Sequence, residues 1–220
     1  QEEMNHEERV QIAKKLTDMM VKKYGDEILL GGYGGSTARN TDTEYSDLEM
    51  FFIVNNSSKA KSRQFGFADK GTPVEVLVKK VAEVESDIEE VDIEWPLKMG
   101  ILFNSKITCG DRAILEKFRK TLESVPQEKF DRCSAKETAL CYEGLGRLKA
   151  VKIRKNTHET GLFVAEVLQE FNLLVAVLNR EFINHDYLGC LKEAYKFKKL
   201  PKGFENNAKK LLNWTSMTID

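Results

Sequence analysis

The sequence predicts a two-part α/β protein, in which a mixed sheet with flanking helices comes first and a helical bundle follows. Short apolar runs bounded by Gly, Asn and Ser recur in residues 28–109, as expected of strands. After Pro126 the apolar residues recur at helical spacing instead. The 220 residues suffice for one large domain or two small ones. We therefore expect domains at 1–126 and 127–220.

The individual elements follow from the same patterns. An amphipathic helix is predicted over residues 5–24, and Gly25 is placed to end it. Strands are predicted at the apolar runs 28–33, 48–54, 74–78 and 107–109. Helices are predicted at 81–91 and 112–122 and, in the second part, at 128–152, 158–180, 187–197 and 204–213.

Composition places the chain among ordinary globular proteins. Hydrophobic residues make up 41% and charged residues 31%, and no run approaches the roughly 18 apolar residues of a membrane helix. We therefore expect no membrane partner. The four cysteines (Cys109, Cys133, Cys141 and Cys190) are scattered without a Cys-x-x-Cys pair, which favours reduced thiols and a cytoplasmic setting.

Charge is distributed unevenly along the chain. Residues 1–110 contain 14 Lys and Arg against 20 Asp and Glu, whereas residues 111–220 contain 20 against 15. An acidic first part would repel phosphates, so it argues against a nucleic-acid surface there. It suits a site that gathers metal ions and a cationic acceptor. The alternative is two solvated surfaces without functional meaning.

Two acids stand at the start of the second predicted strand. Because side chains alternate along a strand, Asp47 and Glu49 project to the same face, about 6 to 7 Å apart. Carboxylate oxygens in such a pair are the ligands that Mg²⁺ prefers. Glu75 is the only polar residue of the next strand, and an adjacent strand would bring it within reach as a third acid. The alternative is a set of solvated acids on an edge strand.

A glycine-rich turn precedes these acids. Gly34, Gly35 and Ser36 follow the first strand, and a helical turn with Arg39 is expected next. Glycine lets a backbone approach a phosphate closely, and N–H groups at a helix start favour an anion. Gly-Gly-Ser alone is typical of an ordinary turn. Followed after ten residues by Asp-x-Glu, it indicates a nucleotide site.

These motifs resemble those of the DNA polymerase β-type nucleotidyltransferase superfamily. Residues 41–50 are similar, nearly one by one, to the kanamycin nucleotidyltransferase family within it. The resemblance extends to residues 74–76, 95–97 with Gly100, and 200–203. It implies a mixed-sheet nucleotidyltransferase domain followed by a helical bundle domain.

The resemblance also implies roles for single residues. Gly35, Ser36 and Arg39 fall on the nucleotide-binding positions, and Asp47 and Glu49 fall on the metal-binding ones. Glu75 falls on a third catalytic acid.

In the helical part, Glu143 falls on the catalytic general base, and Arg147 falls on a basic nucleotide-binding position. Glu143 and Arg147 are four residues apart, so an ordinary surface ion pair is the alternative. Two departures stand out, since Ala38 replaces a glycine and Arg147 replaces a lysine.

The function expected from these features is Mg²⁺-dependent nucleotidyl transfer. A nucleoside triphosphate, expected to be ATP, would give its nucleoside monophosphate to a hydroxyl of an aminoglycoside or similar polyhydroxylated amine, releasing pyrophosphate. The resemblance implies a homodimer that shares the site. Two alternatives stay open: a nucleotidyltransferase of the antitoxin type that modifies a partner protein, and a non-catalytic nucleotide-binding module.

Overall fold

The computed structural model describes residues 4–155, 157–185 and 187–213, and the chain divides into two compact units. The sheet unit comprises Gln1–Glu90 and Lys98–Val125, and the helical unit comprises Val91–Leu97 and Pro126–Asp220. The division at Val125 lies next to the expected boundary. That Val91–Leu97 would join the helical unit was not predicted.

The sheet unit is built on a five-stranded mixed sheet in the order β3-β4-β2-β1-β5. Its strands are β1 (Ile28–Tyr33), β2 (Leu48–Val54), β3 (Arg63–Asp69), β4 (Thr72–Lys80) and β5 (Lys106–Gly110). Strands β2 and β4 are parallel, and the other neighbouring pairs are antiparallel. The mixed α/β class expected from the sequence is confirmed. The edge strand β3 was not predicted.

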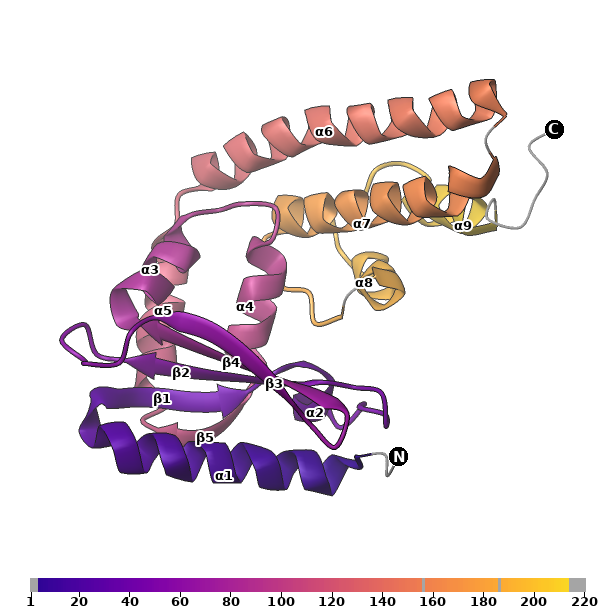
Figure 1. The fold of residues 1–220 in the computed structure, drawn as a ribbon. Coiled ribbons are helices and arrows are strands. Elements are labelled where there is room, and N and C mark those ends of the chain that lie inside the picture. Colours follow the sequence, from indigo (N-terminus) through magenta and orange to yellow (C-terminus); the bar gives the residue numbers. More distant parts are fainter. Residues whose placement is uncertain (1–3, 156, 186, 214–220) are drawn as a thin grey trace. The chain divides into compact units, whose positions relative to one another are not determined.

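Helix α1 (His6–Tyr24) covers one face of the sheet (Figure 1). It begins at a capping box, in which Asn5 Oδ1 accepts from the Glu8 N–H and the Glu8 carboxylate accepts from the Asn5 N–H. Apolar side chains of α1 pack on the main core of the unit. That core contains alternate residues of the central strands, namely Leu48, Met50, Phe52, Val54, Val74, Val76 and Val78.

The opposite face of the sheet is covered by α3 (Val81–Glu89) and by the part of α4 (Trp95–Phe103) that belongs to this unit. There Met99 and Leu102 lie with Phe51 and Leu77 around a small apolar cavity. Helix α5 (Ala113–Ser124) packs against α3, and an unpredicted 3-10 turn, Gly25–Glu27, links α1 to β1.

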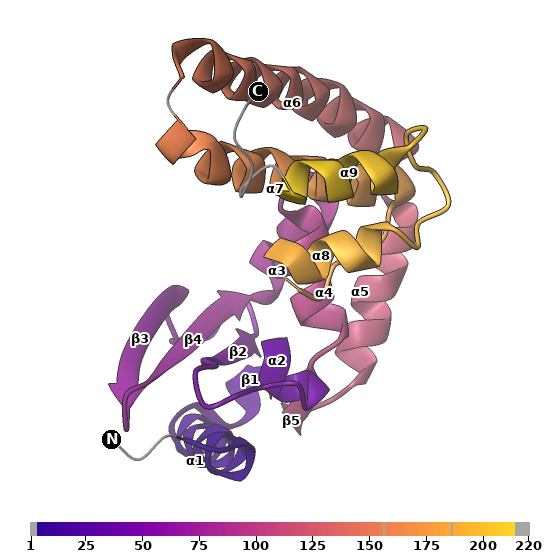
Figure 2. The same cartoon turned by 90° about the vertical axis from the view of Figure 1, so that its right-hand side faces the viewer.

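The helical unit is organised around two long helices that lie side by side, α6 (Gln127–Arg154) and α7 (Thr160–Asn179), as Figure 2 shows. A 3-10 turn, Thr157–Glu159, joins them, and α8 (Tyr187–Ala194) and α9 (Phe204–Asn213) pack against α7. Trp95 is fully buried in this unit, with its ring edge-on to Phe130 at 5.0 Å between centroids. This contact accounts for the assignment of Val91–Leu97.

Helix α7 is long and apolar enough, by length and composition, to cross a membrane, although the sequence predicted no such stretch. Half of that stretch is buried within the fold. Val164, Leu168 and Val175 belong to the core cluster of the helical unit, so packing inside the protein accounts for the hydropathy of α7. No disulfide joins the four cysteines, all of which lie in described residues.

Candidate active site

The glycine-rich turn lies directly against one of the predicted acids. Strand β1 runs into Gly34, whose N–H donates to the Glu49 carbonyl oxygen at 2.9 Å. Gly35 has a φ of +63° and begins the short helix α2 (Gly35–Arg39). A Cβ at Gly35 would lie under 3.0 Å from Glu49 Oε2, closer than real Cβ atoms come. The turn expected to receive phosphate and a carboxylate expected to hold metal therefore adjoin.

The two polar residues predicted on this turn lie on α2. Ser36 is half-buried, and its carbonyl oxygen accepts from the Thr41 N–H at 3.0 Å. Arg39 is half-buried as well. Its Nε is buried without a hydrogen-bond partner among the described residues. A buried guanidinium nitrogen in that state is a donor available to a ligand oxygen.

The three predicted acids lie on or beside two neighbouring strands. Glu49 on β2 is the in-register neighbour of Glu75 on β4, and Asp47 immediately precedes β2. Glu49 is half-buried, whereas Asp47 and Glu75 are exposed. The alternation along β2 and β4 sets these acids opposite the core-facing residues Leu48 and Val74, as the sequence predicted.

Glu75 has a partner that the sequence analysis missed. Its Oε2 accepts from Gln64 Nε2 of β3 at 3.2 Å. Within residues 4–155, 157–185 and 187–213, no three Asp, Glu, His or Cys side chains lie close enough to hold one metal ion. Glu75 is in contact with the edge strand in this structure, and its role as a third catalytic acid stays a prediction. The donor chemistry of Asp47 and Glu49 still fits a hard divalent cation, since both offer carboxylate oxygens.

A buried ion pair fixes the loop that leads to Asp47. The Arg9 side chain is fully buried, and its Nη1 lies 3.2 Å from Asp42 Oδ2. Arg9 Nε donates to the Ser46 carbonyl oxygen at 3.0 Å, one residue before Asp47. His6 Nδ1 lies 2.8 Å from the other Asp42 oxygen. Thr37 Oγ1 of α2 donates to the Asp47 carbonyl oxygen at 3.4 Å. The backbone at Asp47 is therefore held from two sides.

The predicted base lies on α6 in the helical unit. Glu143 is exposed, and its Oε1 accepts from Arg147 Nη2 at 2.7 Å. Arg147 Nη1 donates to Glu166 Oε1 of α7 at 2.9 Å. The hydrogen bond and charge of Glu143 raise the pKa of Arg147. The i,i+4 ion pair of Glu143 and Arg147, which is the alternative to a catalytic role, is therefore present in the structure.

A further acid stands beside this pair. Burial, followed by the charge of Glu166, raises the pKa of Glu170 on α7. Glu170 Oε2 is buried without a partner among the described residues, and it would lie 3.0 Å from a Cβ placed at Gly144. The signal for it was in the sequence, because Glu166 and Glu170 are the only charged residues of an apolar helix.

No family model matches the chain. An aminoglycoside nucleotidyltransferase (4′) from Bacillus sp. is 27% identical over 209 residues, which are 92% of this chain and 79% of that protein. A protein of the same name from Staphylococcus aureus is 26% identical over the same lengths. The chain is a relative of the nucleotidyltransferases. The resemblance expected from its motifs is confirmed, and so is its place among transferase enzymes.

A solved structure agrees with this kinship at the level of the fold. A nucleotidyltransferase-like protein from Exiguobacterium sibiricum 255-15 matches with a TM-score of 0.50, over 94% of this chain and 69% of that one, at 12% identity. The roles of individual residues in this nucleotidyltransferase relative stay predictions.

Proposed function

We propose that this protein transfers a nucleoside monophosphate from ATP to a hydroxyl of an aminoglycoside. The acceptor oxygen forms a bond to the α-phosphorus, and the bond from that phosphorus to the bridging oxygen breaks. Pyrophosphate leaves, and the acceptor proton passes to a carboxylate of the protein. Two relatives at 27% and 26% identity are named for this class of reaction, which supports the proposal.

The observation that carries the proposal is the close approach of Gly35 to the Glu49 carboxylate. Transfer requires the triphosphate and its metal-binding acids to meet at one point, because charge on the phosphate oxygens must be neutralised as the bond breaks. Glycine at position 35 leaves space beside Glu49 that any side chain would fill. A triphosphate on this turn would lie next to the acid.

The turn residues bind and orient the triphosphate in this proposal. The backbone at Gly35 and the Ser36 hydroxyl donate to phosphate oxygens, and the buried Arg39 Nε gains the acceptor that it lacks among the described residues. The Arg9 contact to the Ser46 carbonyl oxygen holds the loop so that Asp47 keeps its place beside Glu49.

Asp47 and Glu49 are the residues proposed to hold magnesium. When bound there, the ion supplies positive charge at the phosphate oxygens. The neighbouring acid Glu75 contributes to the negative potential of the same face, and its hydrogen bond from Gln64 fixes its direction.

Glu143 is proposed to accept the acceptor proton, with Arg147 contributing positive charge toward the nucleotide. In the structure these two residues pair with each other. The proposal therefore requires the Glu143 carboxylate to exchange one contact with Arg147 for the substrate hydroxyl. Arg147 keeps its second partner, Glu166, during that exchange.

The acceptor class and setting are proposed from charge and thiol chemistry. Residues 1–110 carry a net charge of −6, which attracts a polyamine and opposes nucleic acid.

Burial raises the pKa values of Cys133 and Cys141 to about 11, so both thiols stay protonated near neutral pH and fill core space. These thiols suit a reducing cytoplasm.

The test is the mass of the acceptor after incubation with protein, Mg²⁺ and ATP. Kanamycin is expected to gain one nucleoside monophosphate with release of one pyrophosphate. A 4′-deoxy analogue is the control, because the relatives are named for position 4′. Glu143→Gln is expected to lower turnover roughly a hundredfold, the usual scale for loss of a general base, with triphosphate affinity unchanged.

If kanamycin stays unmodified although the protein binds triphosphate, the result would favour a nucleotide-binding module or a protein acceptor. Equal modification of both antibiotics would place the reaction at another hydroxyl.

A further inference from the structure

A cavity of about 130 Å³ lies inside the sheet unit, on the face of the sheet opposite α1. Strands β2 and β4 form one side of it, and α3 and the part of α4 that belongs to this unit form the other. The cavity is therefore a property of the sheet unit alone. Its apolar wall includes Phe51, Ile53, Leu77, Val84, Met99 and Leu102.

The wall offers almost no hydrogen-bond partner to a water molecule among the described residues that line it. A buried water makes about three hydrogen bonds, so a cavity without polar groups stays dry. Three charged residues reach the lining, namely Lys79, Asp87 and Lys98. Lys79 and Asp87 form an ion pair whose side chains are partly exposed, so their charges are satisfied by each other and by solvent. The cavity therefore favours an apolar occupant over water.

The volume of the cavity limits the size of that occupant. A cavity of about 150 Å³ lined by Leu, Ile and Phe side chains takes up benzene or xenon. The present cavity is close to this size and has the same kind of wall. An occupant would give the wall atoms dispersion contacts that they lack beside an empty space. A charged or hydrogen-bonding molecule would lose its water partners without replacement.

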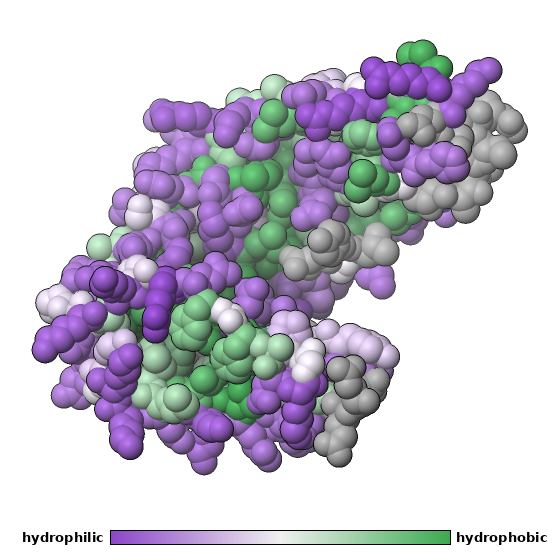
Figure 3. All heavy atoms as spheres, viewed as in Figure 1, coloured by the Kyte–Doolittle hydropathy of each residue, from purple (hydrophilic) through white to green (hydrophobic). Residues whose placement is uncertain are grey.

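A second apolar region of the sheet unit is open to water. It is a groove between α1 and β3, where the space-filling view shows apolar side chains gathered at the surface (Figure 3). Two of its lining residues, Met19 and Phe67, are 58% and 42% exposed, whereas Met99 and Leu102 of the cavity are 1% and 8% exposed. A small molecule in the groove would keep one side in water and gain less from burial. The enclosed cavity is the stronger site.

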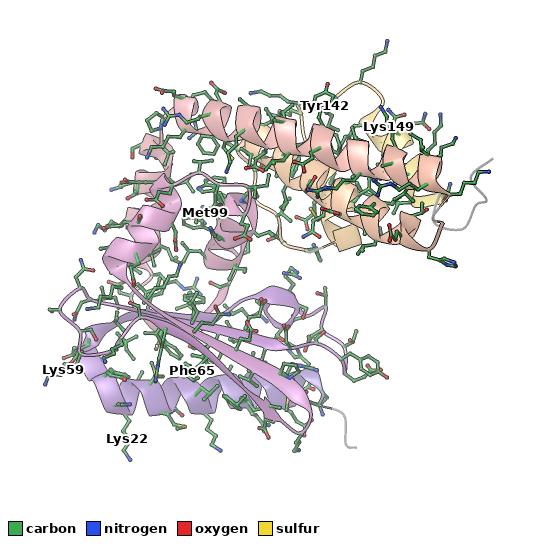
Figure 4. All side chains as sticks on the ribbon, turned by 45° about the horizontal axis from the view of Figure 1, so that its top comes forward. Lys22, Lys59, Phe65, Met99, Tyr142 and Lys149 are labelled. Atoms are coloured by element: carbon green, nitrogen blue, oxygen red, sulfur yellow. The ribbon has the colours of Figure 1, made fainter. Side chains whose placement is uncertain are left out.

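The cavity begins one register pair beyond the predicted acids. Glu49 pairs with Glu75 across β2 and β4, and Phe51 pairs with Leu77 two residues further along the same face. Met99 of α4 (Figure 4) lines the cavity from the helix side. Neither acid lines the cavity, so an occupant would not displace a ligand held by these acids.

We propose that this cavity binds small uncharged apolar molecules of about the size of benzene. Burial of apolar surface and dispersion contacts hold the occupant. No hydrogen bond orients it, so aromatic rings and short hydrocarbons of similar volume are accepted alike. The site is distinct from the proposed transfer of nucleotide, and its test does not depend on activity.

Benzene and phenol, which differ by one hydroxyl, test the chemical class of the occupant in thermal unfolding of the full chain. Benzene is expected to bind with a dissociation constant of about 1 mM and, at ten times that concentration, to raise the melting temperature by about 3 °C. Phenol is expected to bind at least about tenfold more weakly, because its hydroxyl would be buried without a partner. Equal shifts with both molecules, or no shift with benzene, would overturn the proposal.

Leu102→Phe tests the place of binding, because the larger side chain would occupy the cavity itself. This variant is expected to lose the benzene shift. Leu140→Phe makes the same change at a position of α6 that is 43% exposed, and it is expected to keep the shift. Phe67→Ala removes a side chain from the open groove and should also keep it. A shift that survives Leu102→Phe, or that Phe67→Ala abolishes, would place benzene elsewhere and overturn the proposal.

Leu102→Ala covers the case in which Leu102→Phe does not fold. The smaller side chain enlarges the cavity, so the melting temperature without ligand is expected to fall and the benzene shift to exceed that of the unmodified protein. Leu140→Ala is the matched control and should do neither. A crystal pressurised with xenon locates the site independently, and a xenon atom in contact with Met99 and Leu102 is expected. A benzene shift that does not grow in Leu102→Ala, or a cavity without xenon, would contradict the proposal.

Discussion

At the scale of single residues, Gly35 meets two constraints that no other residue type satisfies. Its φ of +63° strains any side-chain-bearing residue, and a Cβ would collide with Glu49 Oε2. We expect Gly35→Ala to push the Glu49 carboxylate aside and to lower triphosphate affinity and turnover by at least about tenfold, which is about 1.4 kcal/mol. Calorimetric titration with a non-hydrolysable triphosphate and Mg²⁺ measures the first effect.

Gly71→Ala separates the two constraints. Gly71 has a φ of +83°, but a Cβ there would meet nothing within 4 Å. The control therefore has backbone strain of about 1 kcal/mol without the collision. It should lose some stability and keep its affinity for triphosphate. Similar losses of affinity in both variants would mean that strain alone accounts for the effect, and that Gly35 does not adjoin a triphosphate.

The buried pair of Arg9 and Asp42 gives a second prediction. Both side chains are at most 2% exposed. Asp42→Ala leaves the Arg9 guanidinium buried beside no carboxylate, so a stability loss of about 3 to 5 kcal/mol is expected in urea unfolding. Lys70→Ala removes a pair that is largely exposed and should change little. Little change in both variants would show that Arg9 does not fix the loop before Asp47.

Glu170 makes the stability of the helical unit depend on pH. Its pKa is raised in the folded state by burial and by the charge of Glu166, and further by the charges of Glu137 and Glu143. The charge of Arg147 lowers the pKa and offsets part of this rise. Below the ordinary glutamate pKa of 4.5 both the folded and the unfolded state hold the proton, and the raised pKa carries no penalty. As pH rises through the folded pKa, the folded state alone resists ionisation and stability is lost.

Glu170→Gln removes this penalty. We expect it to raise the melting temperature at pH 7 and to leave it nearly unchanged at pH 4, as measured by thermal unfolding. An equal gain at both pH values would assign the effect to packing and not to charge. A loss of stability at pH 7 would show that the Glu170 carboxylate is favourably paired.

At the scale of elements, the sequence predicted those strands and helices whose pattern is local. Strand β1 is an apolar run and β2 is apolar except for Glu49, and the predicted bounds of both strands agree with the structure. Strand β3 was not predicted because six of its seven residues are exposed and Gly66 interrupts its sequence pattern. Helix α4 was not predicted. Its first residue, Trp95, packs against Phe130, which lies 35 positions later in the sequence and is not part of a local pattern.

Helix α4 contributes residues to both units, and the contact of Trp95 with Phe130 can be tested by substitution. Trp95 is fully buried and lies against Phe130 and Phe182. Trp95→Ala should destabilise the helical unit by about 3 to 5 kcal/mol through the cavity it leaves. Tyr142→Ala, at a side chain 73% exposed, is the control and should change little. Circular dichroism during urea unfolding measures both, and equal stabilities would place Trp95 outside the core.

At the scale of the whole molecule, the sequence located the acids and the turn but not what holds them. Asp47, Glu49 and Gly35 come from motifs a few residues long. The Arg9–Asp42 pair joins residues 33 positions apart, and Gln64 reaches Glu75 from a strand that was not predicted. Such partners depend on tertiary packing, which periodicity does not contain. Glu170 was visible as a charge in an apolar helix, but its raised pKa arises from burial.

We propose that the acids beside Gly35 are the centre of nucleotide transfer. Pyrophosphate release from ATP and Mg²⁺ in the presence of kanamycin tests it most directly, in the unmodified protein and in Asp47→Asn. Asp18→Asn, at an exposed position of α1, is the control. We expect Asp47→Asn to lower the rate by about a hundredfold or more with the fold intact, and Asp18→Asn to keep the rate of the unmodified protein. Near-normal release of pyrophosphate by Asp47→Asn would mean that this carboxylate holds no metal for the reaction.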